Sequence, residues 1–225
     1  MSINKCKIGG IVAEVPKRMN SLFYGDVLEI RLDINRKDID KIEHVTCLIV
    51  DKELIERAMN TIGVGDYLFC FGHFVSLEYK RKQLVKCPHC GKEGYRMRKA
   101  QHTDIILRDF EVTKGIDLSD SDGVNRVVLT GVVKNPIQQR EGHNRFQIVN
   151  NRPIQAQQHL MEIVTEELLA GSERFNLVNV NTFNGLATHV SKTVKQSNRV
   201  IVKGSIYDRI INIRFLVSVS IVKKV

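Results

Sequence analysis

The sequence predicts a mainly β protein made of two tandem five-stranded Greek-key barrels, each with a helix between its third and fourth strands. Two observations predict this. The order strand, strand, strand, helix, strand, strand occurs twice in the 225 residues, and an acidic, glycine-flanked segment at 114–123 separates the two runs. Its composition is that of a short linker. We therefore expect one barrel in residues 1–115, a linker at 116–123 and a second barrel in residues 124–225.

The first barrel is predicted more from the order of its elements than from individual residues. Runs rich in β-branched and aromatic residues are typical of strands, whereas Leu54, Ile55, Ala58 and Met59 have helical spacing before Gly63. The expected strands cover residues 6–15, 22–33, 45–50, 66–79 and 104–112, with a helix over residues 52–62. A hairpin insertion, residues 80–103, connects the last two strands.

The second barrel has the clearer pattern. Leu186, Val190 and Val194 recur at every fourth position, which predicts an amphipathic helix between two strands. Gly204, inside the following strand, suggests a bulge that curls the sheet. Strands are expected over residues 126–136, 176–183, 199–206 and 210–222. A helical insertion is predicted over residues 154–171, begun by Pro153 and ended by Gly171.

Three segments of the second half resemble the bacterial single-stranded DNA-binding protein (SSB) family. They are VVLTGVVKNP at 127–136, FNGLATHV at 183–190 and RVIVKGSIY at 199–207, in the family's order and at nearly its separations. The resemblance implies two OB-folds, small barrels that bind oligonucleotides. It also implies binding of single-stranded DNA without sequence preference, and assembly as a dimer. The helix at 154–171 and the end IVKKV, without an acidic tail, depart from the family.

Charge and composition favour a nucleic-acid partner. The formal net charge is +9, and 43 % of the residues are hydrophobic, which indicates packed domains. No apolar run reaches the length of a membrane span and the N-terminus MSINKCK lacks a signal-peptide core, so we expect a cytoplasmic protein with no membrane partner. Cys6, Cys47 and Cys70 lie alone in apolar strands and are predicted to be reduced core residues.

The positive charge is concentrated in the hairpin insertion. Residues 80–99 contain eight basic side chains and one acid. Such runs are often only solvated surface, but aromatic residues flank this one, which favours contact with phosphates. The expected contact residues of the hairpin are Lys80, Arg81, Lys82, Arg96, Arg98 and Lys99.

Aromatic residues complete the predicted nucleic-acid site. The resemblance places Phe183 at a base-stacking position at the end of the third strand, although a core phenylalanine is the alternative. Tyr79, seven residues beyond Gly72, falls at a second stacking position, whereas the matching residue of the second barrel is Ile211. Contacts are also expected on or beside the last two strands, from Tyr207, Arg209 and Arg214.

Cys87-Pro-His-Cys90-Gly at the hairpin tip has the spacing of a zinc knuckle. It is half of a structural zinc site, for which His102 on the returning arm is the expected third ligand and His89 another candidate. A redox-active disulfide and a plain turn are the alternatives. Zinc is therefore the one cofactor that we expect, with Cys87, Cys90 and His102 as its expected ligands.

No nucleotide-binding, hydrolase or metalloprotease motif occurs, so we expect no catalysis. The sequence favours a single-stranded DNA-binding protein acting in replication, recombination or repair, with RNA as a second possible ligand. The alternatives are a primosome-type, plasmid or phage replication accessory protein, and an OB-fold adaptor that binds other proteins. Salt-sensitive binding to oligo-dT distinguishes a strand binder from an adaptor.

Overall fold

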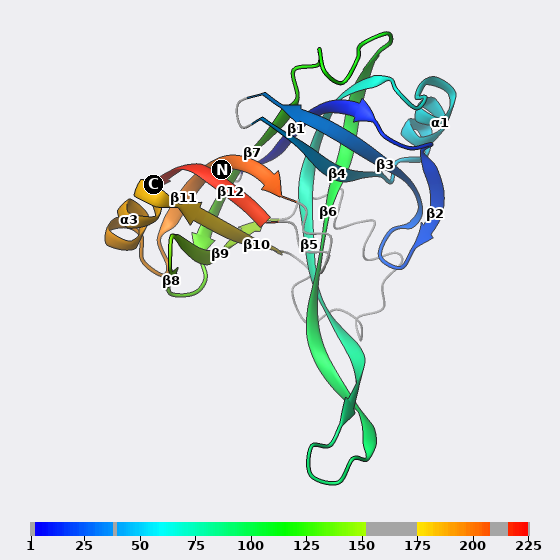
Figure 1. The fold of residues 1–225 in the computed structure, drawn as a ribbon. Coiled ribbons are helices and arrows are strands. Elements are labelled where there is room, and N and C mark those ends of the chain that lie inside the picture. The colour runs from blue at the N-terminus through cyan, green and yellow to red at the C-terminus, as the bar shows by residue number, and fades with distance from the viewer. Residues whose placement is uncertain (1–2, 38–39, 152–174, 208–215, 225) are drawn as a thin grey trace.

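The computed structural model describes residues 3–37, 40–151, 175–207 and 216–224, which form one twelve-stranded sheet curled into two barrels (Figure 1). The helix predicted over residues 154–171 and residues 210–215 of the last predicted strand lie outside the described ranges. In the described part, no helix is long and apolar enough to cross a membrane. The mainly β fold with two tandem barrels is confirmed.

The first barrel closes through a short contact between its first two long strands. Its strands follow the order β3-β4-β6-β5-β1, and β1 pairs again with β3 at Ile11↔Asp33. Gly10 makes this approach possible, because a Cβ there would lie 2.6 Å from the carbonyl oxygen of Asp33. The elements are β1 (Asn4–Val12), β3 (Gly25–Arg36), β4 (Lys41–Ile49), α1 (Lys52–Thr61), β5 (Tyr67–Lys86) and β6 (Glu93–Thr113).

The second barrel repeats this arrangement. Its order is β7-β11-β12-β10-β9, closed by pairing of β7 with β9 at Val132↔Val149, and Gly131 approaches the Val149 carbonyl as Gly10 approaches that of Asp33. The predicted bulge is confirmed by the register shift between Lys203 and Gly204. The elements are β7 (Val124–Val133), β9 (His143–Asn151), β10 (Phe175–Phe183), α3 (Asn184–Thr193), β11 (Arg199–Tyr207) and β12 (Leu216–Lys224).

Two short strands were not predicted. β2 (Lys17–Ser21) pairs with β3, and β8 (Gln138–Arg140) pairs with β9, at corresponding places in the two barrels. Both have mostly exposed side chains. Neither therefore shows the alternation of apolar and polar residues by which a strand is recognised.

The two barrels are joined through their first strands. β1 pairs with β7 antiparallel over six residue pairs, from Asn4↔Leu129 to Gly9↔Val124. Cys6 lies opposite Val127, and each is four residues before the glycine that closes its own barrel. The pairing is therefore nearly symmetric about this point, and the sheet and the core run without a break from one barrel to the other.

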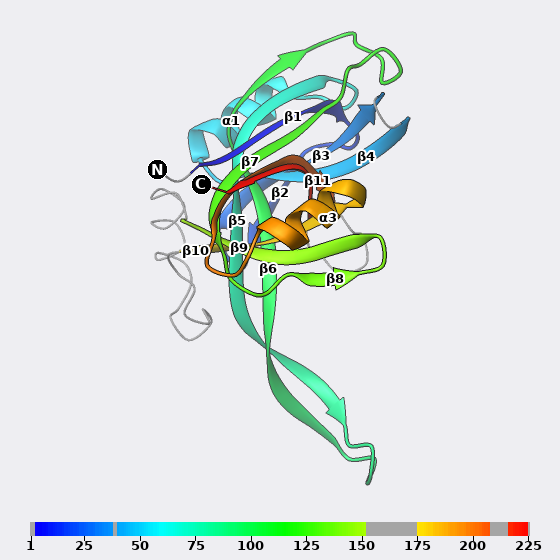
Figure 2. The same cartoon turned by 90° about the vertical axis from the view of Figure 1, so that its left-hand side faces the viewer.

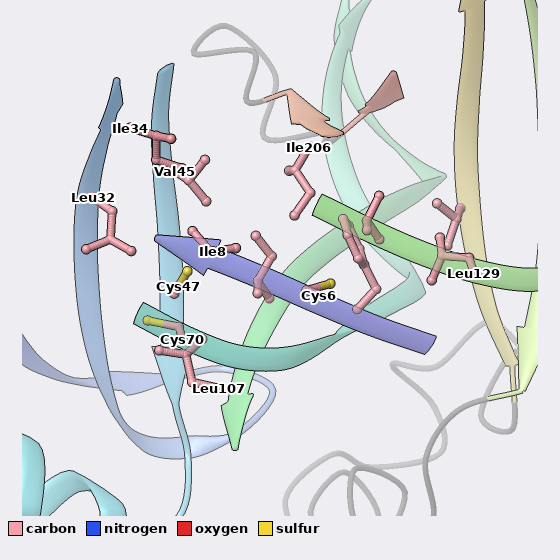
Figure 3. Close-up of a cluster of buried hydrophobic side chains, with 14 of the residues drawn as sticks. Cys6, Ile8, Leu32, Ile34, Val45, Cys47, Cys70, Leu107, Leu129 and Ile206 are labelled. Atoms are coloured by element: carbon pink, nitrogen blue, oxygen red, sulfur yellow. The ribbon is translucent and has the colours of Figure 1, made fainter. Parts of the chain in front are cut away.

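Figure 3 shows part of the core on both sides of this joint. Cys6, Cys47 and Cys70, from three different strands, lie among aliphatic side chains and are all free thiols, buried as predicted. Burial raises the pKa of each thiol well above its ordinary value, so all three stay protonated and behave as small apolar residues.

The segment predicted as a linker packs against the first barrel. The N–H of Gly123 donates to the carbonyl of Asn35 at 3.0 Å, and the side chain of Asn35 donates to the carbonyl of Leu118 at 2.9 Å. The hydroxyl of Tyr67 donates to the carbonyl of Asp122 at 3.1 Å. Because these contacts hold the segment, it positions the start of β7 and does not act as a free tether.

Strands β5 and β6 extend far beyond the first barrel as a long twisted hairpin (Figures 1 and 2). Ten register pairs, from Leu77↔His102 to Lys86↔Glu93, lie outside the barrel. At about 3.3 Å per residue, this ladder projects roughly 30 Å. The hairpin insertion expected at 80–103 is thus a continuation of the two barrel strands.

Candidate nucleic-acid interface

The outer half of the hairpin holds most of the predicted contact residues. Lys80, Lys82, Arg96 and Arg98 are exposed, and for Arg81 and Lys99 the structure describes only the backbone. Lys80 pairs directly with Lys99, and Arg81 with Arg98. Like charges directly opposite each other destabilise a sheet. The hairpin therefore carries a charge density that a polyanion would relieve.

The basic side chains of these arms have no carboxylate partners where the structure describes them. None of the ion pairs found among the described residues involves a basic residue between positions 80 and 99. Between residues 80 and 99 the arms contain one acid, Glu93, opposite Lys86 at the tip. The positive charge is therefore available for external contacts.

Tyr95 is a candidate that the sequence reasoning missed. It lies opposite Leu84 in the ladder, next to the pair Lys86↔Glu93, and its side chain is 76 % exposed. Leu84 and Met97 are exposed beside it. An exposed ring between basic side chains is the arrangement on which bases stack in single-strand binding proteins.

The root of the hairpin is held by a small aromatic cluster. Phe23, in the turn between β2 and β3, stacks on the ring of His102 at 4.8 Å and meets Tyr79 edge-on at 5.3 Å. Asp104 accepts hydrogen bonds from Tyr24 and from His102, both at 2.8 Å. Tyr79 thus serves packing at the root, and its predicted role in base stacking stays a prediction.

Asp104 also controls the charge of His102. Burial alone would lower the pKa of this histidine, but the hydrogen bond and the negative charge of Asp104 outweigh burial, so the pKa is raised above its ordinary value. The contact with Asp104 therefore favours the protonated form of the imidazole in the root of the hairpin.

Phe183 ends β10 on the outer face of the second barrel. It is 44 % exposed and stacks on His143 of β9, with ring centroids 5.8 Å apart. The exposure excludes the alternative that Phe183 is a core residue. Its neighbours Val178 and Val180 alternate with it and fill the core, which turns Phe183 outward. The geometry fits a base-stacking platform, a role that stays a prediction.

A row of amide side chains leads from the hairpin root along this outer face. Asn135 donates to Gln147 at 2.7 Å, Gln147 to Asn179 at 3.0 Å, and Asn179 to Gln101 of β6 at 3.1 Å. Gln101 also donates to the carbonyl of Leu177. The row fixes the hairpin against β10, so the basic arms and the Phe183 platform belong to one connected surface.

Beside this row the surface is hollowed. The hollow has a volume of about 230 Å³ and lies between β9, β10 and the segment that follows β7. Polar groups and one cation line most of it: Asn135, Pro136, Gln138, Arg145, Phe146, Gln147 and Asn179. Hydrogen-bond donors beside an exposed ring suit a nucleic-acid backbone and its bases.

The cysteine knuckle lies at the far end of the hairpin. Cys87 is partly exposed and Cys90 is exposed. The backbone N–H of Cys90, then that of His89, then the Cys90 thiol donate to the Cys87 sulfur and lower its pKa below the ordinary value. These hydrogen bonds bring the two sulfurs together at the tip.

His102 is not near this knuckle. It occupies the hairpin root and packs on Phe23, nine residues along β6 from Glu93, which corresponds to about 30 Å of strand. His102 therefore lies too far from Cys87 and Cys90 to be the third ligand. A spacing of twelve residues in sequence becomes a long distance when the chain is an extended strand. In the described residues, no cluster of three or more His, Cys, Asp or Glu side chains fits a metal ion. Zinc binding by Cys87 and Cys90 stays a prediction.

Three further predicted contact residues are placed only in part. Tyr207 ends β11, where its backbone pairs with Leu216 of β12, and its side chain is not described. Arg209 and Arg214 lie outside the described residues. The structure therefore connects the hairpin arms and Phe183, and the contacts expected from Tyr207, Arg209 and Arg214 stay predictions.

No protein-family model and no curated protein matches the chain. Among solved structures, the single-stranded DNA-binding protein from Thermus aquaticus is similar over 100 % of this chain and 93 % of that one, with a TM-score of 0.63 and 11 % identity. A deletion variant of that protein has a TM-score of 0.63 and 13 % identity. The similarity covers 100 % of this chain and 95 % of the variant. The Plasmodium falciparum protein in complex with single-stranded DNA covers 51 % of this chain and 97 % of its own, with a TM-score of 0.33 and 17 % identity.

The similarity to the Thermus aquaticus structures supports the fold class. The chain is a tandem OB-fold protein in which each barrel has a helix between its third and fourth strands. In particular, its full length follows the architecture of the Thermus aquaticus SSB. The resemblance to the SSB family that the sequence predicted is confirmed at the level of the fold.

Proposed function

We propose that this chain is a non-catalytic protein that binds single-stranded DNA largely without sequence preference. One observation carries the proposal: the basic ladder of the hairpin, with Lys80 opposite Lys99 and Arg81 opposite Arg98, is attached to a barrel face that exposes Phe183. Phosphates would neutralise the ladder while bases stack on the ring. The fold it shares with SSB structures supports the same ligand.

The two parts of the surface have different tasks. The hairpin arms supply phosphate contacts, and the exposed Tyr95 adds a place for a base to stack. The outer face of β9 and β10 supplies the platform of Phe183 and His143. The amide row through Gln101 and Asn179 connects them, so a strand leaving the hairpin reaches the platform over a polar surface.

Contacts of this kind do not distinguish one base sequence from another. Phosphates are the same along every strand, and each base has a face that can stack. A protein that binds in this way coats and protects single strands during replication, recombination or repair. The cytoplasm is the compartment we propose for it.

A salt series with three probes tests the function. Binding of an oligo-dT, a duplex of the same length and an RNA of matching sequence is followed by fluorescence anisotropy between 50 and 400 mM salt. We expect the oligo-dT to bind tightest, with a linear fall of log K against log salt of about 0.7 per phosphate contact. Preference for the duplex, or no binding of any probe, would contradict the proposal. The latter result is what a protein adaptor gives.

A further inference from the structure

The cysteine turn at the hairpin tip has the form of a metal-binding half-site. The N–H of Cys87 donates to the carbonyl of Lys92, and the N–H of Gly91 donates to the carbonyl of Cys87, both at 2.9 Å. Gly91 has a φ of 70°, in the left-handed region that a glycine adopts without strain. The backbone N–H groups of Cys90 and His89 point at the Cys87 sulfur. The turn therefore presents both sulfurs on one side.

The described residues of one chain supply only half of the ligands that such a turn requires. Structural zinc is held by four ligands in a tetrahedron, with Zn–S distances of about 2.3 Å. In the part of the chain that the structure describes, no third His, Cys, Asp or Glu joins Cys87 and Cys90. The other three cysteines are buried in the barrel core, and His102 is at the hairpin root. Among the described residues no side chain completes the site, and the same turn of a second copy offers two further sulfurs.

We propose that the Cys87–Cys90 turns of two copies of this chain close over one Zn²⁺ ion and join two hairpins tip to tip. Each copy contributes two thiolates, so the site has four sulfur ligands. Each thiol loses its proton on binding, and four protons are released for every zinc ion bound. No oxidation takes place. The proposal does not rest on DNA binding.

The shape of the molecule permits this contact. The tip is roughly 30 Å from the first barrel along the ladder, and both views show it projecting away from the two barrels (Figures 1 and 2). Two tips can therefore meet while the barrels stay apart. The exposed position also leaves the sulfurs accessible to metal.

The charges near the tip favour the closed site. One Zn²⁺ with four thiolates carries a net charge of −2. Lys86 and Lys92 flank the turn, and the Cε atom of Lys86 lies 3.9 Å from the place a Cβ of Gly91 would occupy. Four such lysines from two copies would lie near the anionic centre, whose negative charge offsets the repulsion between the two basic hairpins.

The test uses the full chain, purified under reducing conditions and freed of metal. Zn²⁺ is added, and the mass in solution and the bound metal per chain are measured together. We expect saturation at about one zinc per two chains, a mass that increases with metal, and reversal by a chelator. Co²⁺ in place of zinc should give the visible absorption of a tetrahedral tetrathiolate site. Cys87→Ser and Cys90→Ser should each abolish the absorption and the metal-dependent increase in mass.

His89→Ala is the matched control, because it alters the same turn without removing a sulfur. It should bind metal and associate like the natural chain, and the thermal midpoints of all three variants should agree. One zinc per chain without a change in mass would overturn the proposal, as would loss of metal in His89→Ala. An association that a reductant reverses and a chelator does not would identify a disulfide and overturn it as well.

Discussion

On the first barrel, the outer side of the β3–β4 ladder is closed by its own side chains. Arg31 pairs with Glu14 at 3.1 Å and with Glu29 at 3.5 Å, and His44 contacts Asp33 at 2.6 Å. The β9–β10 ladder occupies the same place on the second barrel. It carries the exposed Phe183 and the row of hydrogen-bonded amide side chains.

The turns that precede the two ladders differ as well. Between β2 and β3, the turn carries Phe23 and Tyr24, which are buried against the hairpin root. Between β8 and β9, two residues, Glu141 and Gly142, make the turn, and Phe183 stays uncovered. We therefore expect one fold to serve two tasks: the first barrel builds and anchors the hairpin, and the second presents a platform. The next four predictions test this division.

Acid should weaken the anchoring barrel most. His73 in β5 is 4 % exposed, and burial, followed by the charge of Arg108, lowers its pKa to about 3. The folded state therefore keeps the imidazole ring neutral. The contribution of the neutral ring to the free energy of unfolding is fully present above pH 6.5 and is lost as the pH falls toward 3. We expect a loss of about 2 kcal/mol at pH 5 and about 5 kcal/mol below pH 3.

Hydrogen exchange of the β5 and β6 amides at pH 8 and pH 5 measures this effect. His73→Gln, which does not titrate, should show about 2 kcal/mol less change between the two pH values. The corresponding strands β11 and β12 contain no histidine. An equal loss in both proteins would mean that His73 does not carry the acid sensitivity.

Removing the charge of one hairpin arm should have the largest effect on binding. The triple variant of Lys80, Arg81 and Lys82 to Ala should reduce the salt slope for oligo-dT by up to about two units, at about 0.7 per lost contact. Affinity should fall on the order of 10²-fold at 50 mM salt and little near 1 M. Titrations at four salt concentrations provide the slope.

The matched control removes three arginines that already have carboxylate partners. Arg18, Arg31 and Arg57 pair with acids on the first barrel. Their replacement by Ala changes the net charge equally, but we expect the salt slope to stay within about one contact of the natural chain. If both triple variants behave alike, the hairpin acts only through net charge.

Phe183→Ala should weaken binding by about 1–3 kcal/mol at every salt concentration, because stacking releases no counterions. Its control is Ile42→Ala, which removes another exposed apolar side chain, from β4 of the first barrel. This variant should bind as the natural chain does. Unfolding of Phe183→Ala, followed by circular dichroism, would show that the ring has a structural role and that the platform is misassigned.

The smallest effect is expected on the closed ladder. Glu29→Lys removes one partner of Arg31 and adds a positive charge to the outer side of β3. If DNA does not cross this ladder, the salt slope should change by much less than the 0.7 units of one phosphate contact. An increase in the salt slope by the value of one phosphate contact would mean that the DNA strand contacts both barrels.

Local patterns predicted most of the secondary structure. The spacing of Leu186, Val190 and Val194 located α3, whose Val190 is fully buried. Asp51 caps α1 by accepting from the N–H of Leu54 at 2.9 Å, a signal that lies within three residues. Such features depend on near neighbours in sequence, and the local order of residues reveals them.

The features that sequence missed depend on distant pairings. The register of β5 and β6 is needed to place Tyr95 opposite Leu84. The same register shows that His102 lies at the hairpin root. His143 meets Phe183 forty residues along the chain. The joining of β1 and β7 has no local signal, because either strand could equally have been an exposed edge.

The antiparallel joint at Cys6↔Val127 relates the two barrels by an approximate half-turn. DNA is a directional polymer with a 5′ end and a 3′ end, and a half-turn about this joint reverses the direction in which each ladder would meet it. A strand that runs straight over the molecule therefore crosses one ladder 5′ to 3′ and the other 3′ to 5′. Equal use of both would force the strand to double back. A straight path suits a molecule in which one ladder is open and the other is closed.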